Sequence, residues 1–365
     1  MTGGGAPAIL FVTNGHGEAA IAARIAQETR TLSALRTDHF GLVGERLGAD
    51  GFADVGPRRA MPSGGLVAMG NLRAFGRDLG AGFLGLLARQ VGFLRAARGR
   101  YAGVVAVGDA YACALAGIAG GPLTYVGTAK SVHVARYGPA ERRILARAQR
   151  IFVRDAATAA DLRAHGVPAE APGNVIVDLL ASDARFAWRG AAHLVLLPGS
   201  RERAYADALR IAALVAELRR RGALFDAVLS VAPNLEQARF APALELGGLR
   251  PWSGPLGALL PGATLAIGQS GTANEAAAAQ GVPVVALELD DARRDSWYRK
   301  RQVGLLGDAL LIVPGDPSRG ADAVGALLSD EVRRARMGAA GRDRMGGPGG
   351  ARAIAEAVVG LANAA

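Results

Sequence analysis

Residues 8–20 read AILFVTNGHGEAA, and residues 193–202 read HLVLLPGSRE. Each segment begins with a short apolar run, 8–13 and 193–197, that is typical of a buried β-strand, and each run leads into a glycine-containing turn. Helical patterns follow both turns, over residues 18–35 and from about residue 202 to residue 221. A strand, a tight turn and a helix, in this order, form the unit from which parallel α/β sheets are built. The sequence therefore predicts one such sheet in each half of the chain.

The same alternation of short apolar runs and helical patterns continues outward from both segments. The other strands that we expect are 39–43, 104–107, 123–126, 151–153, 227–231, 264–267 and 282–287, with helices over 110–119 and 156–165 and from residue 273. Strands that alternate with helices favour an α/β fold made of doubly wound, Rossmann-like domains. In sheets of this kind, ligands bind at the carboxyl ends of the strands.

A chain of 365 residues exceeds the usual size of one domain, and 50% apolar residues are enough for two cores. Pro168, Pro172 and Gly173 mark a break between the halves. We predict an N-terminal domain, a linker, a C-terminal domain and a C-terminal helix that packs back on the N-terminal domain. Their predicted limits are 1–170, 171–190, 191–345 and 346–365.

Cysteine content and hydropathy exclude several classes of protein. Cys113 stands alone, so the chain can form no internal disulfide and no cysteine-based zinc site. The first residues lack the positive charge of an export signal. The longest uncharged run, 251–274, contains prolines and several glycines and cannot be one spanning helix. We expect a cytoplasmic protein that is soluble or peripheral on the inner face of the cytoplasmic membrane.

The net charge of +10 is concentrated in residues 58–100, where eight arginines face one acid, Asp78. Leu84 and Leu87, with two further apolar residues at helical spacing, lie opposite Arg89 on the predicted helix. Two interpretations stay open: an ordinary helix that packs on the sheet, or an arginine-bordered apolar surface that binds anionic lipid. We expect no nucleic-acid partner, because no helix-turn-helix or zinc pattern occurs and only 5% of the residues are aromatic.

The turn after the first strand holds Asn14, Gly15, His16, Gly17 and Glu18. Its glycines allow backbone N–H groups to approach a phosphate or a sugar, and the helix N-terminus favours negative charge. The spacing approximates a dinucleotide fingerprint, but the acidic residue expected after the second strand is missing at the required place. His16 and Glu18 are candidate ligand contacts, although Glu18 could serve only to complement the helix dipole.

Asp109 follows the strand 104–107. A carboxylate at the carboxyl end of a strand could accept a proton from a hydroxyl nucleophile. It could equally be the N-cap of the following helix, and both roles together require one carboxylate oxygen to stay free.

Gly199, Ser200 and Arg201 follow the first strand of the second half. Backbone N–H groups, a hydroxyl and a guanidinium in one turn suit a phosphate group. The alternative for Ser200 is a plain N-cap, which leaves Arg201 without a role.

Residues 267–276 read IGQSGTANEA, with Ser270, Gly271, Thr272 and Glu275 as the candidate site residues. The small residues leave the backbone open at a helix N-terminus, which suits a pyrophosphate, and a glutamate one turn inside can bind both hydroxyls of a ribose. Thr272-x-x-Glu275 could instead be a capping box. A hydrolase nucleophile elbow is disfavoured, because Thr272 stands where that motif has glycine.

Together these motifs resemble lipid-A-disaccharide synthase, and above all the shorter lipid-A-disaccharide synthase-related proteins, which share the opening 14–18. The resemblance spans about residues 8–315. It implies a GT-B glycosyltransferase with two Rossmann-like domains that face each other across a cleft. It also implies a UDP-sugar on the C-terminal domain, an acceptor on the N-terminal domain and no metal. The second-half residues that carry it are 196–201, Ser270-Gly271-Thr272-x-x-Glu275 with Gly281-x-Pro283, and Gly173-Asn174 with Asp178.

The resemblance also implies residue roles. Ser200 and Arg201 face the diphosphate, Gly271 and Thr272 lie beneath it, and Glu275 binds ribose. Asp109 follows the strand that bears the proposed base of the family, and His16 is a second candidate for that role. The sequence departs from the family at 17–20 and 132–135. Both departures lie on the acceptor side, so they put the acceptor in question more than the donor.

The sequence therefore predicts an inverting hexosyltransferase that moves a GlcNAc-like sugar, with or without an acyl chain, from UDP to a lipid or glycolipid hydroxyl. Residues 58–100 are expected to contact an anionic membrane. No cofactor or metal is expected, since no Asp-x-Asp occurs and the histidines are scattered. Two alternatives stay open: a UDP-GlcNAc 2-epimerase, and a non-catalytic protein that binds a sugar nucleotide or a lipid.

Overall fold

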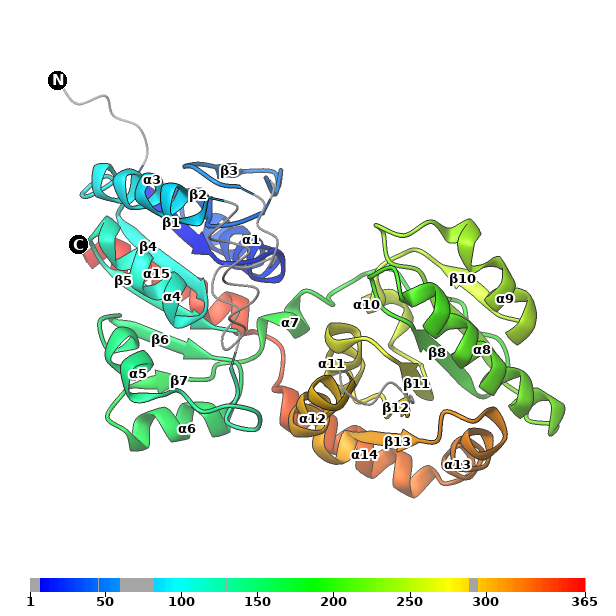
Figure 1. The fold of residues 1–365 in the computed structure, drawn as a ribbon. Coiled ribbons are helices and arrows are strands. Elements are labelled where there is room, and N and C mark those ends of the chain that lie inside the picture. The colour runs from blue at the N-terminus through cyan, green and yellow to red at the C-terminus, as the bar shows by residue number, and fades with distance from the viewer. Residues whose placement is uncertain (1–6, 45, 60–81, 129, 289–294, 365) are drawn as a thin grey trace. The chain divides into compact units, whose positions relative to one another are not determined.

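The computed structural model of the chain describes residues 7–44, 46–59, 82–128, 130–288 and 295–364, without the side chains of residues 16 and 295–298. The chain divides into two compact units, each of which is described by itself (Figure 1). Unit 1 consists of residues 1–179 and 348–365, and unit 2 consists of residues 180–347.

Unit 1 contains a parallel sheet of seven strands within the described part of the chain. The strand order is β3-β2-β1-β4-β5-β6-β7, so successive strands extend one way from β1 and the other way from β4. The strands are β1 (Ala8–Thr13), β2 (Arg36–Gly41), β3 (Phe52–Asp54), β4 (Gly103–Gly108), β5 (Leu123–Gly127), β6 (Arg150–Val153) and β7 (Ala169–Glu170).

Helices cover both faces of this sheet, because successive side chains of a strand point to opposite faces. In β1, Leu10 and Val12 pack toward α3, α4, α5 and α6, whereas Ile9 and Phe11 pack toward α1 and α15. The helices are α1 (His16–Leu32), α3 (Phe83–Ala96), α4 (Ala110–Ala116), α5 (Pro139–Leu145), α6 (Ala156–Ala164), α7 (Val175–Asp178) and α15 (Gly350–Ala364), with a 3₁₀ turn η1 (Gly117–Ala119).

The C-terminal helix α15 belongs to unit 1, where it packs against α1. Its start is held by Asp178, whose carboxylate accepts hydrogen bonds from the backbone N–H groups of Gly349 (2.6 Å) and Ala351 (2.7 Å). A carboxylate at this place satisfies N–H groups that have no partner within the helix.

Unit 2 repeats the architecture with six parallel strands among its described residues. The order is β10-β9-β8-β11-β12-β13, and it reverses between β8 and β11. The strands are β8 (His193–Leu197), β9 (Asp226–Ser230), β10 (Arg250–Trp252), β11 (Leu265–Gly268), β12 (Val284–Leu287) and β13 (Leu310–Val313). The helices are α8 (Ala204–Arg220), α9 (Ala241–Gly247), α10 (Leu256–Leu259), α11 (Gly271–Ala279), α12 (Asp295–Leu306), α13 (Pro317–Ser329) and α14 (Glu331–Met345), with the 3₁₀ turns η2 (Gln237–Phe240) and η3 (Gly307–Ala309).

Two doubly wound, Rossmann-like units confirm the predicted fold class. No helix in the described part of the chain has both the length and the apolar character that crossing a membrane requires.

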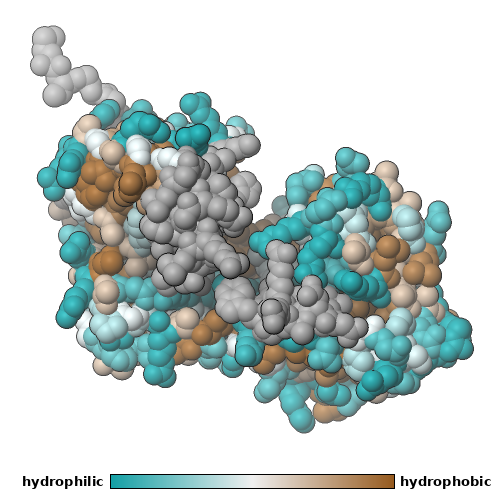
Figure 2. Space-filling model, in the orientation of Figure 1, coloured by the Kyte–Doolittle hydropathy of each residue, from teal (hydrophilic) through white to brown (hydrophobic). Residues whose placement is uncertain are grey.

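The basic stretch 58–100 is described only in part, because 60–81 lie outside the described residues. Helix α3 buries Phe83, Leu86, Gln90 and Leu94, so most of its apolar side packs on the sheet. The predicted apolar face is therefore only partly correct: Leu84 is 65% exposed. Figure 2 shows hydrophobic residues on the visible surface of unit 1 over α3.

Candidate functional site

Each sheet has a point where its strand order reverses, and the predicted site residues lie on the loops and helix starts that follow the four strands at these points. In unit 1 the strands are β1 and β4, and in unit 2 they are β8 and β11. In open α/β sheets, ligands bind outside the carboxyl ends of the strands at such points. The topology therefore gathers the residues within each unit into one group.

Asp109 and Asn14 meet at the reversal point of unit 1. The Nδ2 of Asn14, which is buried, donates to Oδ2 of Asp109 over 3.0 Å. Asp109 is also the N-cap of α4, because its Oδ1 accepts from the backbone N–H of Ala112 at 2.9 Å. Both carboxylate oxygens thus accept a hydrogen bond, so the predicted condition that one oxygen stays free is not met. Each carboxylate oxygen has a second lone pair, so Oδ2 retains the capacity to accept a proton.

Glu18 folds back over the two glycines of this group. A Cβ at Gly15 would lie 2.5 Å from Oε2 of Glu18, and a Cβ at Gly108 would lie 3.1 Å from its Cγ. Gly108 also has φ +132°, a backbone conformation that favours glycine. The close approach of the glutamate therefore depends on glycine at both positions.

The two carboxyl groups of unit 1 have different environments. Burial raises the pKa of Glu18, a hydrogen bond to its own backbone N–H lowers it, and the nearby charge of Asp109 raises it again. Asp109, in contrast, is held by two hydrogen-bond donors. Neighbouring carboxyl groups in unlike environments are a common basis for assigning an acid and a base.

Two hydroxyl groups that sequence reasoning missed lie at the same edge. The Tyr111 and Thr128 hydroxyl oxygens are buried and have no hydrogen-bond partner among the described residues. Burial, together with the charge of Asp109, raises the pKa of Tyr111 to about 12, so this hydroxyl keeps its proton. Thr128 is joined to β4 by a hydrogen bond from its N–H to the Gly108 carbonyl. The only indication of these hydroxyls in the sequence is the position of Tyr111, two residues after Asp109.

The remaining predicted residues of this edge are less informative. Gly15 is the N-cap of α1, and Gly17 is exposed with open space where a Cβ would stand. The His16 backbone begins α1, but its side chain lies outside the described residues.

In unit 2, the loop after β8 presents Ser200 and Arg201 as exposed side chains. Gly199 has φ +116°, which permits the sharp turn at the end of the strand. Helix α8 begins at Ala204 rather than near residue 202, and its N-cap is Arg203. The N-cap interpretation of Ser200 is therefore wrong.

The loop after β11 begins a nine-residue helix, α11. Ser270 is its N-cap, and the Ser270 Oγ accepts from the Ala273 N–H at 3.4 Å. The proposed capping box between Thr272 and Glu275 is therefore wrong: Thr272 lies inside the first turn and is exposed, and Glu275 is buried. The first N–H groups of a helix have no partner within it, so this turn can donate to an anion.

A buried amide beneath the loop, also missed by sequence reasoning, fixes its course. Nδ2 of Asn274 donates to the Gly268 carbonyl (3.3 Å) and to Oε1 of Gln302 (3.4 Å). A Cβ at Gly268 would lie only 1.9 Å from Oδ1 of Asn274. The Gln269 N–H donates to the Leu197 carbonyl at 3.0 Å, so the loops after β8 and β11 start side by side.

No group of three or more histidine, cysteine, aspartate or glutamate side chains in the described part of the chain could hold a metal ion. The edge of unit 2 instead offers backbone N–H groups, hydroxyls, a guanidinium and a buried carboxylate, which suit a phosphate and a diol.

No protein-family model and no curated protein sequence matches the chain. Among solved structures, CalG4, the calicheamicin glycosyltransferase, superposes with a TM-score of 0.62 at 18% identity, over 97% of this chain and 98% of that one. The chain has the GT-B fold.

Two further GT-B structures support the same conclusion. UDP-GlcNAc 2-epimerase from Neisseria meningitidis, bound to UDP-GlcNAc, gives a TM-score of 0.57 at 15% identity, over 96% of this chain and 99% of that one. MurG from Acinetobacter baumannii also gives 0.57, at 11% identity, over 97% and 99%. At identities this low, the superpositions show a shared fold and nothing more specific.

Proposed function

We propose that this GT-B protein is an inverting glycosyltransferase that moves a GlcNAc-like sugar from UDP to the hydroxyl of a lipid or glycolipid, in the manner of lipid-A-disaccharide synthase. The observation that carries the proposal is the content of the two reversal points. One has two adjoining loops suited to a diphosphate, and the other has a pair of carboxyl groups suited to proton transfer.

The donor would bind at the carboxyl edge of unit 2. Ser200, Arg201 and the backbone at Gly199 would hold one phosphate, and the start of α11 at 270–272 would hold the other. Glu275 would take the ribose hydroxyls. Negative charge grows on the leaving UDP in the transition state, and preorganised N–H groups and a guanidinium stabilise it there.

The acceptor would bind at the carboxyl edge of unit 1, where Asn14, Gly15, Gly17 and Glu18 form the lining. In this proposal Asp109 removes the proton of the attacking hydroxyl, with His16 as the alternative base. Neither a metal nor a resident cofactor takes part.

UDP binding tests the donor site. At 100 times its Kd, UDP should stabilise unit 2 by about 2.7 kcal/mol. All three tryptophans lie in unit 2, so their fluorescence follows its thermal unfolding. Arg201→Ala should reduce the shift in melting temperature, whereas Arg336→Ala, an exposed arginine on α14, should leave it unchanged. Absence of any shift with millimolar UDP would exclude the donor assignment.

Asp109→Asn tests the base. Asparagine can still cap α4, so turnover should fall by about 10²–10⁴ while UDP binding persists. Asp155→Asn is the matched control, because Asp155 caps α6 in the same unit by accepting from the Thr158 N–H at 2.7 Å. Turnover is measured as UDP released from a panel of UDP-sugars with extracted membrane lipids. Undiminished turnover in the Asp109 variant would exclude it as the base.

Epimerisation of UDP-GlcNAc is the second candidate, because a UDP-GlcNAc 2-epimerase shares the fold over nearly the whole chain. The two activities differ in their need for an acceptor. Conversion of UDP-GlcNAc to its C-2 epimer in the absence of lipid, followed by NMR, would identify the epimerase.

Attachment to an anionic membrane through residues 58–100, at the inner face of the cytoplasmic membrane, is part of the same proposal. Exposed Leu84 and Arg89 support it, because both lie on α3 outside the packed face. Leu84→Ser with Arg89→Glu should reduce co-sedimentation with phosphatidylglycerol vesicles. Equal binding by this variant would argue against attachment through α3.

A further inference from the structure

Unit 1 has a concave site whose lining contains none of the predicted site residues. It is an open pocket of about 630 Å³. Arg95 and Arg98 enter it from the end of α3, and Arg147 enters it from the residues after α5. The rest of its lining is Cys113, Ala114, Gly117, Ile118, Gly121 and Leu123. Three arginines thus share a lining that contains no acidic residue.

The pocket lies at the amino edge of the sheet. Leu123 is the first residue of β5, and α3, α4 and α5 all end beside the pocket. The carboxyl groups of Asp109 and Glu18 lie at the carboxyl edge instead. The pocket is therefore separate from the candidate acceptor site.

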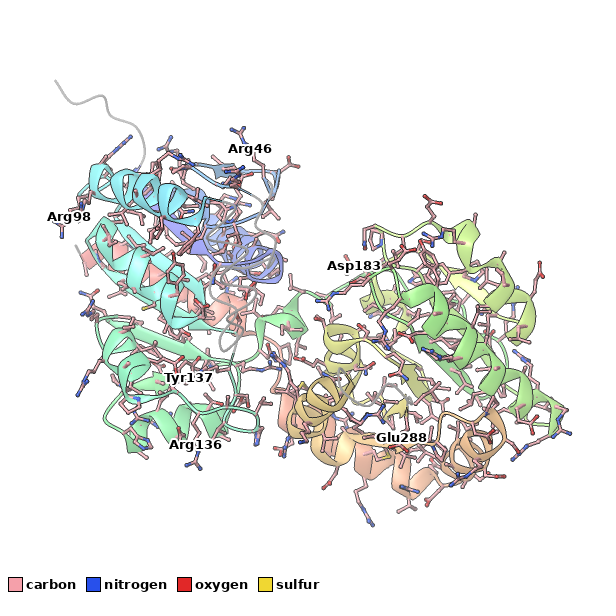
Figure 3. All side chains as sticks on the ribbon, viewed as in Figure 1. Arg46, Arg98, Arg136, Tyr137, Asp183 and Glu288 are labelled. Carbon is pink, nitrogen blue, oxygen red and sulfur yellow. The ribbon has the colours of Figure 1, made fainter. Side chains whose placement is uncertain are left out.

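The three guanidinium groups are exposed and form no ion pair or hydrogen bond with the residues that the structure describes. Figure 3 labels Arg98 at the end of α3. Its aliphatic stem packs near Gly120, where a Cβ would lie 3.7 Å from the Arg98 Cγ. The charge of Arg147 acts on Cys113 in the pocket lining. Burial raises the pKa of the Cys113 thiol to about 12, and the nearby charge of Arg147 works against this rise.

Basic residues after helices often serve only to complement the helix dipole. Whether this accounts for the three arginines depends on how much negative charge the helix ends carry. A helix C-terminus carries about half a negative charge, so three of them offset about 1.5 of the three positive charges. About 1.5 charges are left in a concave site without an acidic partner. A concave surface lined by one sign of charge concentrates the field and attracts counter-ions.

We propose that this pocket binds the phosphate group of a glycerol-phosphate-like ligand. Guanidinium groups match the geometry of phosphate oxygens in paired hydrogen bonds, and two segments supply them from different sides. Ile118, Leu123 and Ala114 offer apolar contact to the carbon atoms next to the phosphate. A phospholipid headgroup and a soluble phosphate ester share this chemistry. Binding of a lipid headgroup here would rest on the membrane attachment proposed for residues 58–100, which include Arg95 and Arg98, whereas binding of a soluble ester requires neither UDP nor glycosyl transfer and goes beyond the proposed function.

Two probes and two triple variants of the full-length chain test the pocket. The probes are glycerol 3-phosphate, followed by calorimetry, and phosphatidylglycerol vesicles, followed by co-sedimentation against phosphatidylcholine vesicles. The pocket variant replaces Arg95, Arg98 and Arg147 with serine. The control variant replaces three exposed arginines outside the pocket with serine, and so removes the same positive charge. They are Arg46, Arg189 and Arg336.

We expect the pocket variant to bind at least tenfold more weakly and the control variant to bind within twofold of the wild type. Loss of glycerol 3-phosphate binding would identify a soluble ester as the ligand, and loss of vesicle binding alone would identify a lipid headgroup. The proposal is overturned if the wild type binds neither probe, or if both variants weaken equally, since the charge would then act diffusely. RNA binding that is lost in the pocket variant but is not displaced by glycerol 3-phosphate would also overturn it. UDP stabilisation should persist in the pocket variant, which separates this test from that of the donor site.

Discussion

A buried chain of hydrogen bonds beside β1 permits a quantitative test of unit 1. The Thr13 hydroxyl donates to Nε2 of His39 over 2.9 Å, and Nδ1 of His39 donates to Asp54 over 2.7 Å. Asp54 also accepts from Arg58 (2.7 Å) and from the Gly48 N–H (3.1 Å). Thr13 and His39 are each only 1% exposed. We predict that His39→Phe destabilises unit 1 by about 3 kcal/mol, because it removes two of these buried hydrogen bonds.

Two losses make up this value. The Thr13 hydroxyl becomes a buried group without its partner, at a cost of about 1–3 kcal/mol, and Asp54 loses a charge-assisted bond worth about 1.5–3 kcal/mol. Asp54 keeps its two other donors, which places the sum near the lower part of the range. Phenylalanine preserves the stacking of ring 39 on Phe52, whose centroids lie 5.0 Å apart. Thr13→Val added to His39→Phe removes the orphaned hydroxyl, so the double variant should regain about 1 kcal/mol or more.

Urea unfolding provides the assay. All three tryptophans lie in unit 2, so their fluorescence reports that unit, whereas far-ultraviolet circular dichroism reports both. With a slope of about 2–3 kcal/mol per M, the unit 1 transition should shift by about 1–1.5 M. The fluorescence transition should stay in place. Strictly additive effects of Thr13→Val and His39→Phe would refute the assigned hydrogen-bond chain.

The pH dependence of the free energy of unfolding provides a second test of the same variant. Burial lowers the pKa of His39 below its ordinary value of 6.5, more than its bond to Asp54 raises it. Below pH 6.5, His39 therefore binds a proton in the unfolded chain but not in the folded chain. The wild type loses stability as the pH falls. His39→Phe lacks this proton. The difference between wild type and variant should shrink from pH 7.5 to pH 5.5, and an equal difference at both values would contradict the assignment.

Three further predictions concern single residues. Asp178→Ala removes the acceptor of two N–H groups at the start of α15, so it should cost about 1–3 kcal/mol and make α15 more sensitive to limited proteolysis. Gly268→Ala should destabilise unit 2 by more than about 2 kcal/mol, measured by tryptophan fluorescence, because its Cβ would collide with the buried Asn274 amide. Gly325→Ala is its matched control in unit 2: this glycine lies on α13, its Cβ would make only an ordinary contact of 3.8 Å with Leu218, and a gain of about 0.5–1 kcal/mol is expected. Glu18→Gln should become more stable relative to the wild type as the pH rises above 4.5, measured as melting temperature, because a raised pKa makes the ionised carboxyl unfavourable in the folded state.

Strands β1 and β8 could be predicted from the sequence to the residue. The other inner strands could be predicted only with limits one to three residues off, β2 being expected at 39–43 and observed at 36–41, and the edge strands could not be predicted. Strands β1 and β8 are buried apolar runs flanked by strands on both sides, and the limits 8–13 and 193–197 are confirmed. Strands β3, β7 and β10 have only two or three residues, and β10 contains Pro251. An edge strand pairs on one side only, tolerates proline and needs no continuous apolar run, so the pattern carries little signal there.

The same distinction applies to the site. The loops could be found because turn residues and acids follow predicted strands at the edge where ligands bind. The partnership of Asn14 with Asp109 could not, because the residues are 95 positions apart and meet only through the β1–β4 pairing. The capping residue of α11 was misplaced by two positions, since Ser270 and Thr272 both suit the role by type. The roles proposed for the donor residues and for His16 stay predictions.

The choice between glycosyl transfer and epimerisation depends on unit 1. A diphosphate and a ribose are common to the substrates of both reactions, so the loops of unit 2 do not discriminate between them. At the edge of unit 1, the buried hydroxyls of Tyr111 and Thr128 have no partner among the described residues. Each such group costs about 1–3 kcal/mol until something bonds to it. The hydroxyls of an acceptor and those of the sugar of UDP-GlcNAc are both suited to be those partners. Removal of both hydroxyls, in Tyr111→Phe with Thr128→Val, should therefore weaken acceptor-dependent UDP release if transfer is the reaction, and acceptor-independent epimerisation if it is not.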